Sequence, residues 1–275
     1  MTRICALLST LLFAACLPEP RLVDSFDDAL PAESLWGLDV VVGAGDLRVI
    51  GEEELPDILV SVRVYSVLSD CNHDEDALAD MSYELYAADD GAARLWVDID
   101  PERFDYYADV EVRVPAAMAA IVRDGSGDVW VENVAALELD DETGDAQIER
   151  ISGDVKVQDG TGDLLILDVG GAVTLDDGGG DAQIRDIAGP LQVIDGGGDL
   201  WMEGIGAAVR VEDAGGDLML REVQGDAALW DSSGDIDVEH VSGTVTIRDG
   251  SGDIRASDVG DLEIIEDDGG DVWWE

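Results

Sequence analysis

Short runs of alternating apolar and polar residues are the main local signal in this chain. Leu200–Ile205 and Val209–Asp213 are typical, because apolar side chains recur in each run at nearly every second residue. A period of two predicts β-strands with one buried face. Glycine and aspartate residues lie between the runs, where turns require positive φ angles and side-chain-to-backbone hydrogen bonds.

These runs recur at a fixed period. The phrase Asp-x-x-Gly-Asp occurs nine times from Asp124 onward, and its Gly-Asp steps are 17 residues apart once and then 18 residues apart seven times. A fixed short period indicates a solenoid in which each repeat forms one coil. Two strands and two turns per repeat predict an all-β fold, a single-stranded parallel β-helix (β-solenoid) with coils of about 18 residues.

Alignment of the repeats places apolar residues in columns. Stacked about 4.8 Å apart, such columns would form a narrow, dry aliphatic core. Ile184, Ile187 and Leu220 are predicted to point into this core.

The chain is predicted to divide into four parts. They are a signal peptide (1–15), a tether (16–34), an irregular N-terminal β region (35–120) and the regular solenoid of Gly-Asp repeats (121–275). The irregular region is expected to form opening coils or a small β subdomain. Either would cap the solenoid, whose terminal strands would otherwise be open edges.

The N-terminus resembles a bacterial lipoprotein signal. Arg3 precedes an apolar run from Ile4 to Ala15, too short to span a bilayer, and Phe13-Ala14-Ala15-Cys16 is similar to a lipobox. The resemblance implies that Cys16 is lipidated and anchors the protein to a membrane. Leu17 after the cysteine favours the outer membrane and the cell surface. The alternative is an ordinary signal cleaved near Ala15, which would leave a secreted or periplasmic protein.

The composition is strongly acidic. The net charge is −49, with 64 acidic and 15 basic residues, which excludes binding to a nucleic-acid backbone. A hydrophobic content of 46% indicates that the acidic residues cover a folded protein rather than a disordered one.

Several short motifs are similar to one known family. They are an early Gly45-Asp46, a strand that ends in Val112-Arg113-Val114-Pro115, and coils that contain Ser126-Gly127-Asp128-Val129 or Ser233-Gly234-Asp235-Ile236. Over most of residues 38–275 the chain resembles the bacterial family of adhesin-like β-solenoid domains of unknown function. The resemblance implies a β-solenoid at the cell surface or in the periplasm, often anchored or secreted.

The aspartates of the repeats are candidate calcium ligands. Each Gly-Asp step follows another aspartate by three residues, so stacked coils would form two carboxylate ladders with repulsion between neighbours. Calcium between successive turns would offset this repulsion, and so would hydrogen bonds from turn N–H groups. The candidate ligands are Asp128, Asp145, Asp159, Asp163, Asp177, Asp181, Asp195, Asp199, Asp213 and Asp217.

One outward-facing column is unusually apolar. Its members Trp130, Trp201, Met219 and Trp273 form a candidate binding stripe for surface glycans or proteins. The alternative is that the N-terminal region or a loop covers this stripe.

No catalytic residues are predicted. The two histidines, His73 and His240, are far apart and have no nucleophile motif nearby, and the cluster from Cys71 to Asp76 is either a metal site or a solvated acidic loop. The leading hypothesis is therefore a non-enzymatic, lipid-anchored surface protein with an adhesin-like or structural β-solenoid. A calcium-binding β-roll and a carbohydrate-active β-helix enzyme are the alternatives.

Overall fold

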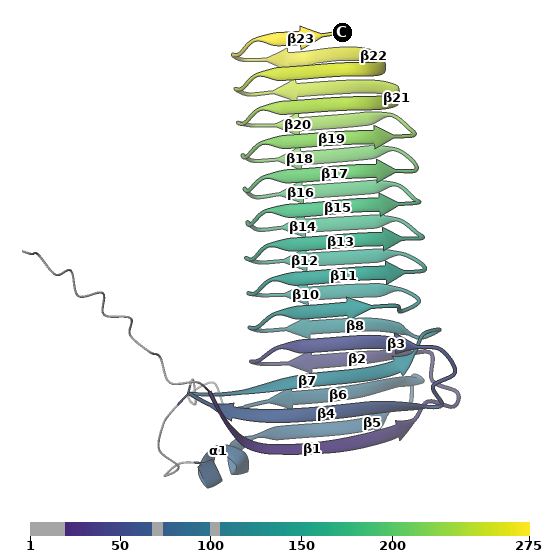
Figure 1. Cartoon of the computed structure of the whole chain (residues 1–275), viewed down its shortest axis with the longest axis vertical. Coiled ribbons are helices and arrows are strands. Elements are labelled where there is room, and N and C mark those ends of the chain that lie inside the picture. Colours follow the sequence, from purple (N-terminus) through teal and green to yellow (C-terminus); the bar gives the residue numbers. More distant parts are fainter. Residues whose placement is uncertain (1–19, 68–73, 100–104) are drawn as a thin grey trace, which may run out of the picture.

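The computed structural model describes residues 20–67, 74–99 and 105–275. This described part contains 23 strands and one short helix. In Figure 1 the strands stack into one long column, with the N-terminal elements at one end and the C-terminus at the other. The predicted β-solenoid is confirmed.

Each regular coil contributes one strand to each of two parallel sheets. The first sheet contains β9 (Val129–Glu132), β11 (Ala146–Ile151), β13 (Leu164–Val169), β15 (Ala182–Ile187), β17 (Leu200–Ile205) and β19 (Leu218–Val223). The second sheet contains β8 (Ala119–Asp124), β10 (Leu137–Asp141), β12 (Val155–Asp159), β14 (Val173–Asp177), β16 (Leu191–Asp195), β18 (Val209–Asp213) and β20 (Ala227–Asp231). Near the C-terminus, β21 (Ile236–Asp249) and β22 (Ile254–Asp267) run through both sheets, and β23 (Val272–Trp274) follows.

The register between coils is the one that the repeat predicts. Leu164 pairs with Ala182, and Ala182 pairs with Leu200, so equivalent residues lie 18 positions apart. Ile184, Ile187 and Leu220 are buried as predicted. The core is a stack of aliphatic layers between the two sheets.

The N-terminal strands continue the same two sheets in a different order. Strands β2 (Gly37–Val42) and β3 (Leu47–Glu52) form a coil between β6 (Ala92–Asp98) and β7 (Tyr106–Pro115) on one side and β8 and β9 on the other. Strands β4 (Asp57–Ser66) and β5 (Ser82–Ala87) then pair antiparallel with β7 and β6, respectively. Helix α1 (Asp74–Asp80) precedes β5. Figure 1 shows these elements at the base of the stack.

The segment expected to be a tether contains a strand of the sheet. Strand β1 (Arg21–Pro31) pairs antiparallel with β4 along its whole length. Phe26 and Leu30 pack against the hydrophobic core from this strand. The expectation for 16–34 was therefore wrong for residues 21–31, because pairing with β4 orders a segment whose own apolar pattern is sparse.

The glycine of each Gly-Asp step is required by the backbone. Gly198 has a φ of +140°, and a Cβ atom there would lie 1.8 Å from the carbonyl oxygen of Gly180 in the preceding coil. A side chain would therefore collide with the neighbouring coil. No helix of the described residues is long and apolar enough to cross a membrane.

Candidate functional site

The aspartates of the Gly-Asp steps form a hydrogen-bonded ladder along one edge of the solenoid. In each coil the aspartate N–H donates to Oδ1 of the equivalent aspartate one coil earlier, at 2.9 Å for Asp163 to Asp145. We call this row the outer ladder. Its acceptors are Asp46, Asp128, Asp145, Asp163, Asp181, Asp199, Asp217, Asp235 and Asp253.

A second row of aspartates lies inside the solenoid at the same edge. We call it the inner column. Its members, each 1–6% exposed, are Asp124, Asp141, Asp159, Asp177, Asp195, Asp213, Asp231 and Asp249. Each is the last residue of a run whose alternate side chains are buried, as in Leu191, Val193 and Asp195. In most coils Oδ1 accepts the N–H two residues later, for example from Gly215 to Asp213 at 2.8 Å.

Burial raises the pKa of the inner carboxyl groups, and the acidic neighbours raise it further. The pKa reaches about 8 for Asp124 and about 7 for Asp177 and Asp231. Backbone N–H donors lower the pKa of Asp177 and Asp231, so the two effects oppose each other. In water these carboxyl groups would be ionised at neutral pH, whereas the interior of the solenoid favours their neutral form.

The structure divides the ten candidate calcium ligands between the two rows. Asp159, Asp177, Asp195 and Asp213 belong to the inner column, and the other six belong to the outer ladder. The outer carboxylates accept backbone N–H groups through Oδ1. Among the described residues, no group of three or more His, Cys, Asp or Glu side chains could hold a metal ion.

The apolar stripe is one continuous surface column on the first sheet. Trp130 pairs with Gln147, and Trp201 pairs with Met219. Trp201 is 37% exposed and Trp273 is 45% exposed, so the N-terminal elements do not cover them. Arginines stack on the three indole rings, with the Arg48 guanidinium carbon 4.6 Å from the ring centroid of Trp130. These contacts orient the aromatic rings on the surface.

A groove runs over the surface column that contains Trp130 and beside the outer ladder. This outer groove has a volume of about 660 Å³ and crosses coils from β3 to β15. Arg48, Trp130, Gln147, Leu165 and Gln183 line it. Along one side are the outer-ladder carboxylates Asp46, Asp128, Asp145, Asp163 and Asp181. The stripe residues Trp201, Met219 and Trp273 lie on later coils beyond it.

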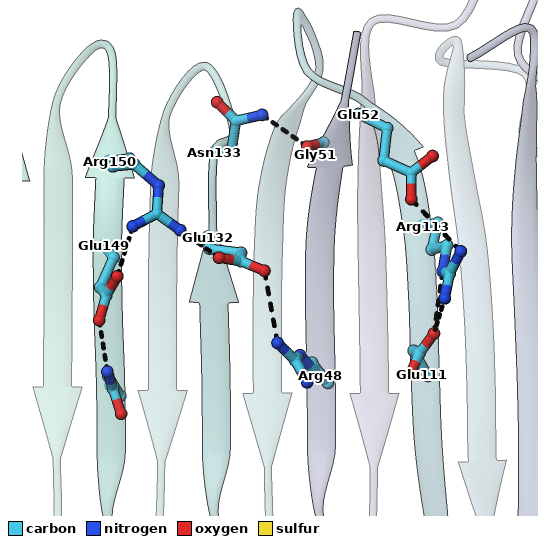
Figure 2. Close-up of polar contacts among 10 residues, drawn as sticks. Arg48, Gly51, Glu52, Glu111, Arg113, Glu132, Asn133, Glu149 and Arg150 are labelled. Atoms are coloured by element: carbon cyan, nitrogen blue, oxygen red, sulfur yellow. Dashed lines mark hydrogen bonds and ion pairs between the residues drawn. The ribbon is translucent and has the colours of Figure 1, made fainter.

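Charged contacts beside the groove hold the first coils together. Figure 2 shows Glu132 between Arg48 and Arg150, and Arg150 also contacts Glu149. The Asn133 side chain donates to the Gly51 carbonyl oxygen at 2.6 Å. These contacts join β3, β9 and β11, so the position of Arg48 against Trp130 is set by several coils.

The remaining sequence candidates are three residues that the structure does not describe and His240. Cys16, Cys71 and His73 lie outside the described residues. His240 is exposed and lies 3.6 Å from Asp258, away from the groove. Sequence reasoning missed both the burial of the inner column and the groove itself. The sequence did contain a signal for this burial, because the inner aspartates continue the alternation of the apolar residues before them.

Comparisons with known proteins identify one family. A family model described as Toastrack DUF4097 matches residues 107–272. Similar solved structures include a candidate adhesin from Bacteroides fragilis, at 15% identity and a TM-score of 0.45 over 92% of this chain and 97% of that chain. Another is a candidate adhesin from Parabacteroides distasonis, at 13% identity and a TM-score of 0.41 over 91% and 97%. No curated protein matches the chain.

Proposed function

Because the chain belongs to the Toastrack DUF4097 family, we propose that it is a non-enzymatic β-solenoid of the cell envelope that binds an extended glycan in its outer groove. The groove is the observation that supports this proposal. It combines an indole ring at Trp130, amides at Gln147 and Gln183, and a row of carboxylates. Aromatic rings pack against the apolar faces of sugars, and amides and carboxylates bind hydroxyl groups.

The repetition of the groove favours a polymer over a compact ligand. Equivalent carboxylates recur in each coil, with Asp145 one coil from Asp163 and Asp163 one coil from Asp181. A glycan that lies along the coil axis would meet the same acceptors at regular intervals. The Oδ1 atoms of these residues already accept backbone N–H groups, which leaves Oδ2 to accept a sugar hydroxyl group.

The membrane anchor is a second part of the proposal. We place the lipid on Cys16, which lies outside the described residues. The chain from Cys16 to Arg21 would reach at most about 18 Å when fully extended. Because Arg21 begins β1, an anchored protein would hold the base of the solenoid close to the membrane surface. Replacement Cys16→Ser should abolish fatty-acid labelling of the protein in cells, and unchanged labelling would overturn the anchor.

The groove is tested by polysaccharide binding to the purified chain, measured by calorimetry over a panel of soluble bacterial and host glycans. Trp130→Ala should abolish binding to the glycan that the native chain binds. Trp230→Ala is the matched control, because Trp230 also stacks under an arginine, Arg210, but lies on the second sheet. Equal losses in both variants, or no binding by the folded native chain, would contradict the proposal. Release of new sugar ends would contradict the non-enzymatic assignment.

A further inference from the structure

The inner column is a continuous row of carboxyl groups in the core of the solenoid. The register pairs its members directly, coil after coil, from Asp124 with Asp141 to Asp231 with Asp249. Neighbouring strands lie about 4.8 Å apart, so successive carboxyl groups of the column follow one another along the axis. At every point the row is shielded from solvent.

One oxygen of each inner aspartate has no hydrogen-bond partner. Oδ2 is buried and unpartnered in all eight members, and in Asp124 and Asp159 neither oxygen has a partner. An ionised carboxylate can only accept hydrogen bonds, so an ionised column would leave a buried charged atom unpaired in every coil. Such an atom is costly to remove from water. A proton on Oδ2 removes the charge and turns the atom into a donor.

In the part of the chain that the structure describes, no cation acts on the column to balance a charge. Apart from the backbone N–H donors of the turns, the groups that act on the inner aspartates are acidic, and they come from neighbouring coils, from the same strands and from the outer ladder. Besides other members of the column, they are Asp46, Asp128, Asp140, Glu142, Asp145, Asp176, Asp181, Asp199, Asp235 and Asp267. The remaining surroundings are the aliphatic core columns, represented by Leu191 and Val193.

We propose that the inner column is a row of eight proton-binding sites, whose aspartates are neutral carboxylic acids in the folded solenoid and make its stability depend on pH. Each protonated Oδ2–H group donates a hydrogen bond within the row, so that one proton per coil replaces one unpaired charge per coil. This inference concerns the core and is independent of the ligand of the outer groove.

The direction of the pH dependence follows from the burial. Burial raises the pKa of Asp213 to about 6 and that of Asp177 to about 7, from the ordinary value of 3.8. Between about pH 4 and pH 8 the folded chain therefore holds protons that the unfolded chain has released. The stabilisation is fully present below this window. It is lost as the pH rises, because ionisation of the folded column must then leave charges in the core.

The test compares two triple variants of the full chain. Asp177→Asn, Asp195→Asn and Asp213→Asn replace inner carboxyl groups by amides, which keep an acceptor for the turn N–H and place a donor where the proposal puts Oδ2–H. The matched control is Asp181→Asn, Asp199→Asn and Asp217→Asn, which removes the same number of charges from the outer ladder. Thermal unfolding is followed by circular dichroism from pH 5 to pH 8, with a metal chelator present and again with calcium.

The native chain should show a falling melting temperature across this range. The inner variant should melt about 5–10 °C above the native chain at pH 8, with a flatter pH profile, while the control keeps the native slope. A flat native profile, or an inner variant that melts below the native chain at pH 8, would show that the column is ionised. A slope that calcium abolishes in the native chain alone would assign the column to cations instead.

A measurement without variants keeps the inference testable if the inner variant does not fold. Infrared spectroscopy of the native chain at pH 6 should show the carbonyl band of protonated carboxyl groups, which solvent-exposed aspartates have lost at this pH. The band should vanish when the chain is unfolded at the same pH. A native spectrum with carboxylate bands only would overturn the proposal.

Discussion

At the residue scale, one position in each coil has a left-handed backbone although it usually has a side chain. Asn133, Arg150, Asp168, Asp186, Glu222, His240 and Asp258 have φ angles of 51–59°, and the equivalent residue of one coil is Gly204 with a φ of 75°. This conformation lets the next residue return to the core, so that both Ile148 and Ile151 are buried around Arg150. Each non-glycine residue there costs about 1–2 kcal/mol.

This position predicts a stabilising substitution. Glu222→Gly should raise the free energy of unfolding by about 0.5–1 kcal/mol, because the strain relieved exceeds the added flexibility of the unfolded chain. The reciprocal change Gly204→Glu in the preceding coil should lower it by a similar amount. Urea unfolding of both variants checks the pair. A loss of stability in Glu222→Gly would mean that the Glu222 side chain makes a contribution larger than the backbone strain.

At the scale of the coil, the closest contact between neighbours is the stacked glycine turn. In the turn before Asp199, Gly197 and Gly198 are adjacent but differ in their surroundings. A Cβ at Gly198 would lie 1.8 Å from the Gly180 carbonyl oxygen, whereas the nearest atom to a Cβ at Gly197 is 3.5 Å away. Other coils have serine or threonine at the Gly197 position, as at Ser126 and Thr143.

The two glycines should therefore respond differently to the same substitution. Gly198→Ser should destabilise the chain by more than about 4 kcal/mol or prevent folding, because the backbones of two coils would have to separate. Gly197→Ser should cost less, about 1–2 kcal/mol, because its φ of +152° strains a side chain although the added Cβ would have no atom closer than 3.5 Å. Soluble yield and denaturant midpoints measure the difference. Similar midpoints would show that the coils can shift apart without loss of the ladder.

The regular coils could be predicted from the sequence because every signal is local and repeated. The alternation places Ile184 and Leu220 inward, and the fixed period places Trp201 beside Met219. The N-terminal order could not be predicted in this way. Strands β2 and β6 pair across more than 40 intervening residues, as Gly37 with Ala92, and no local pattern specifies that contact.

The candidate site was predictable only as far as it follows the same columns. Trp130 and the stripe were found from their outward positions. The groove depends on how the surface column and the outer ladder are shaped in three dimensions. The order of residues along the sequence does not contain this information. The inner column was hidden because aspartate beside glycine usually indicates an exposed turn. Its burial follows from the position of Asp195 on the inward face after Leu191 and Val193.

At the scale of the whole molecule, the coils form an elongated stack (Figure 1), and acidic residues recur in every coil. The net charge is −49 because 64 acidic residues are compensated by only 15 basic ones. The outer ladder aligns carboxylates along one edge. Two unit charges 4 Å apart repel by about 1 kcal/mol in water, so several rungs together oppose a total stability of about 5–15 kcal/mol. Salt ions can screen the repulsion between carboxylates of the outer ladder, but they do not reach the buried inner column.

Salt should therefore stabilise the solenoid through the outer ladder. An increase of sodium chloride from about 0.01 M to about 1 M shortens the screening length from about 30 Å to about 3 Å, and should raise the melting temperature at pH 7. The outer triple variant Asp181→Asn, Asp199→Asn and Asp217→Asn should gain less from salt than the native chain, since part of the screened repulsion is already absent. The inner triple variant should gain as much as the native chain.

Calcium at matched ionic strength separates screening from binding. A larger rise in melting temperature than in sodium, lost only in the outer variant, would show that divalent ions occupy the ladder. A melting temperature independent of salt would mean that the N–H donors of the turns offset the whole repulsion.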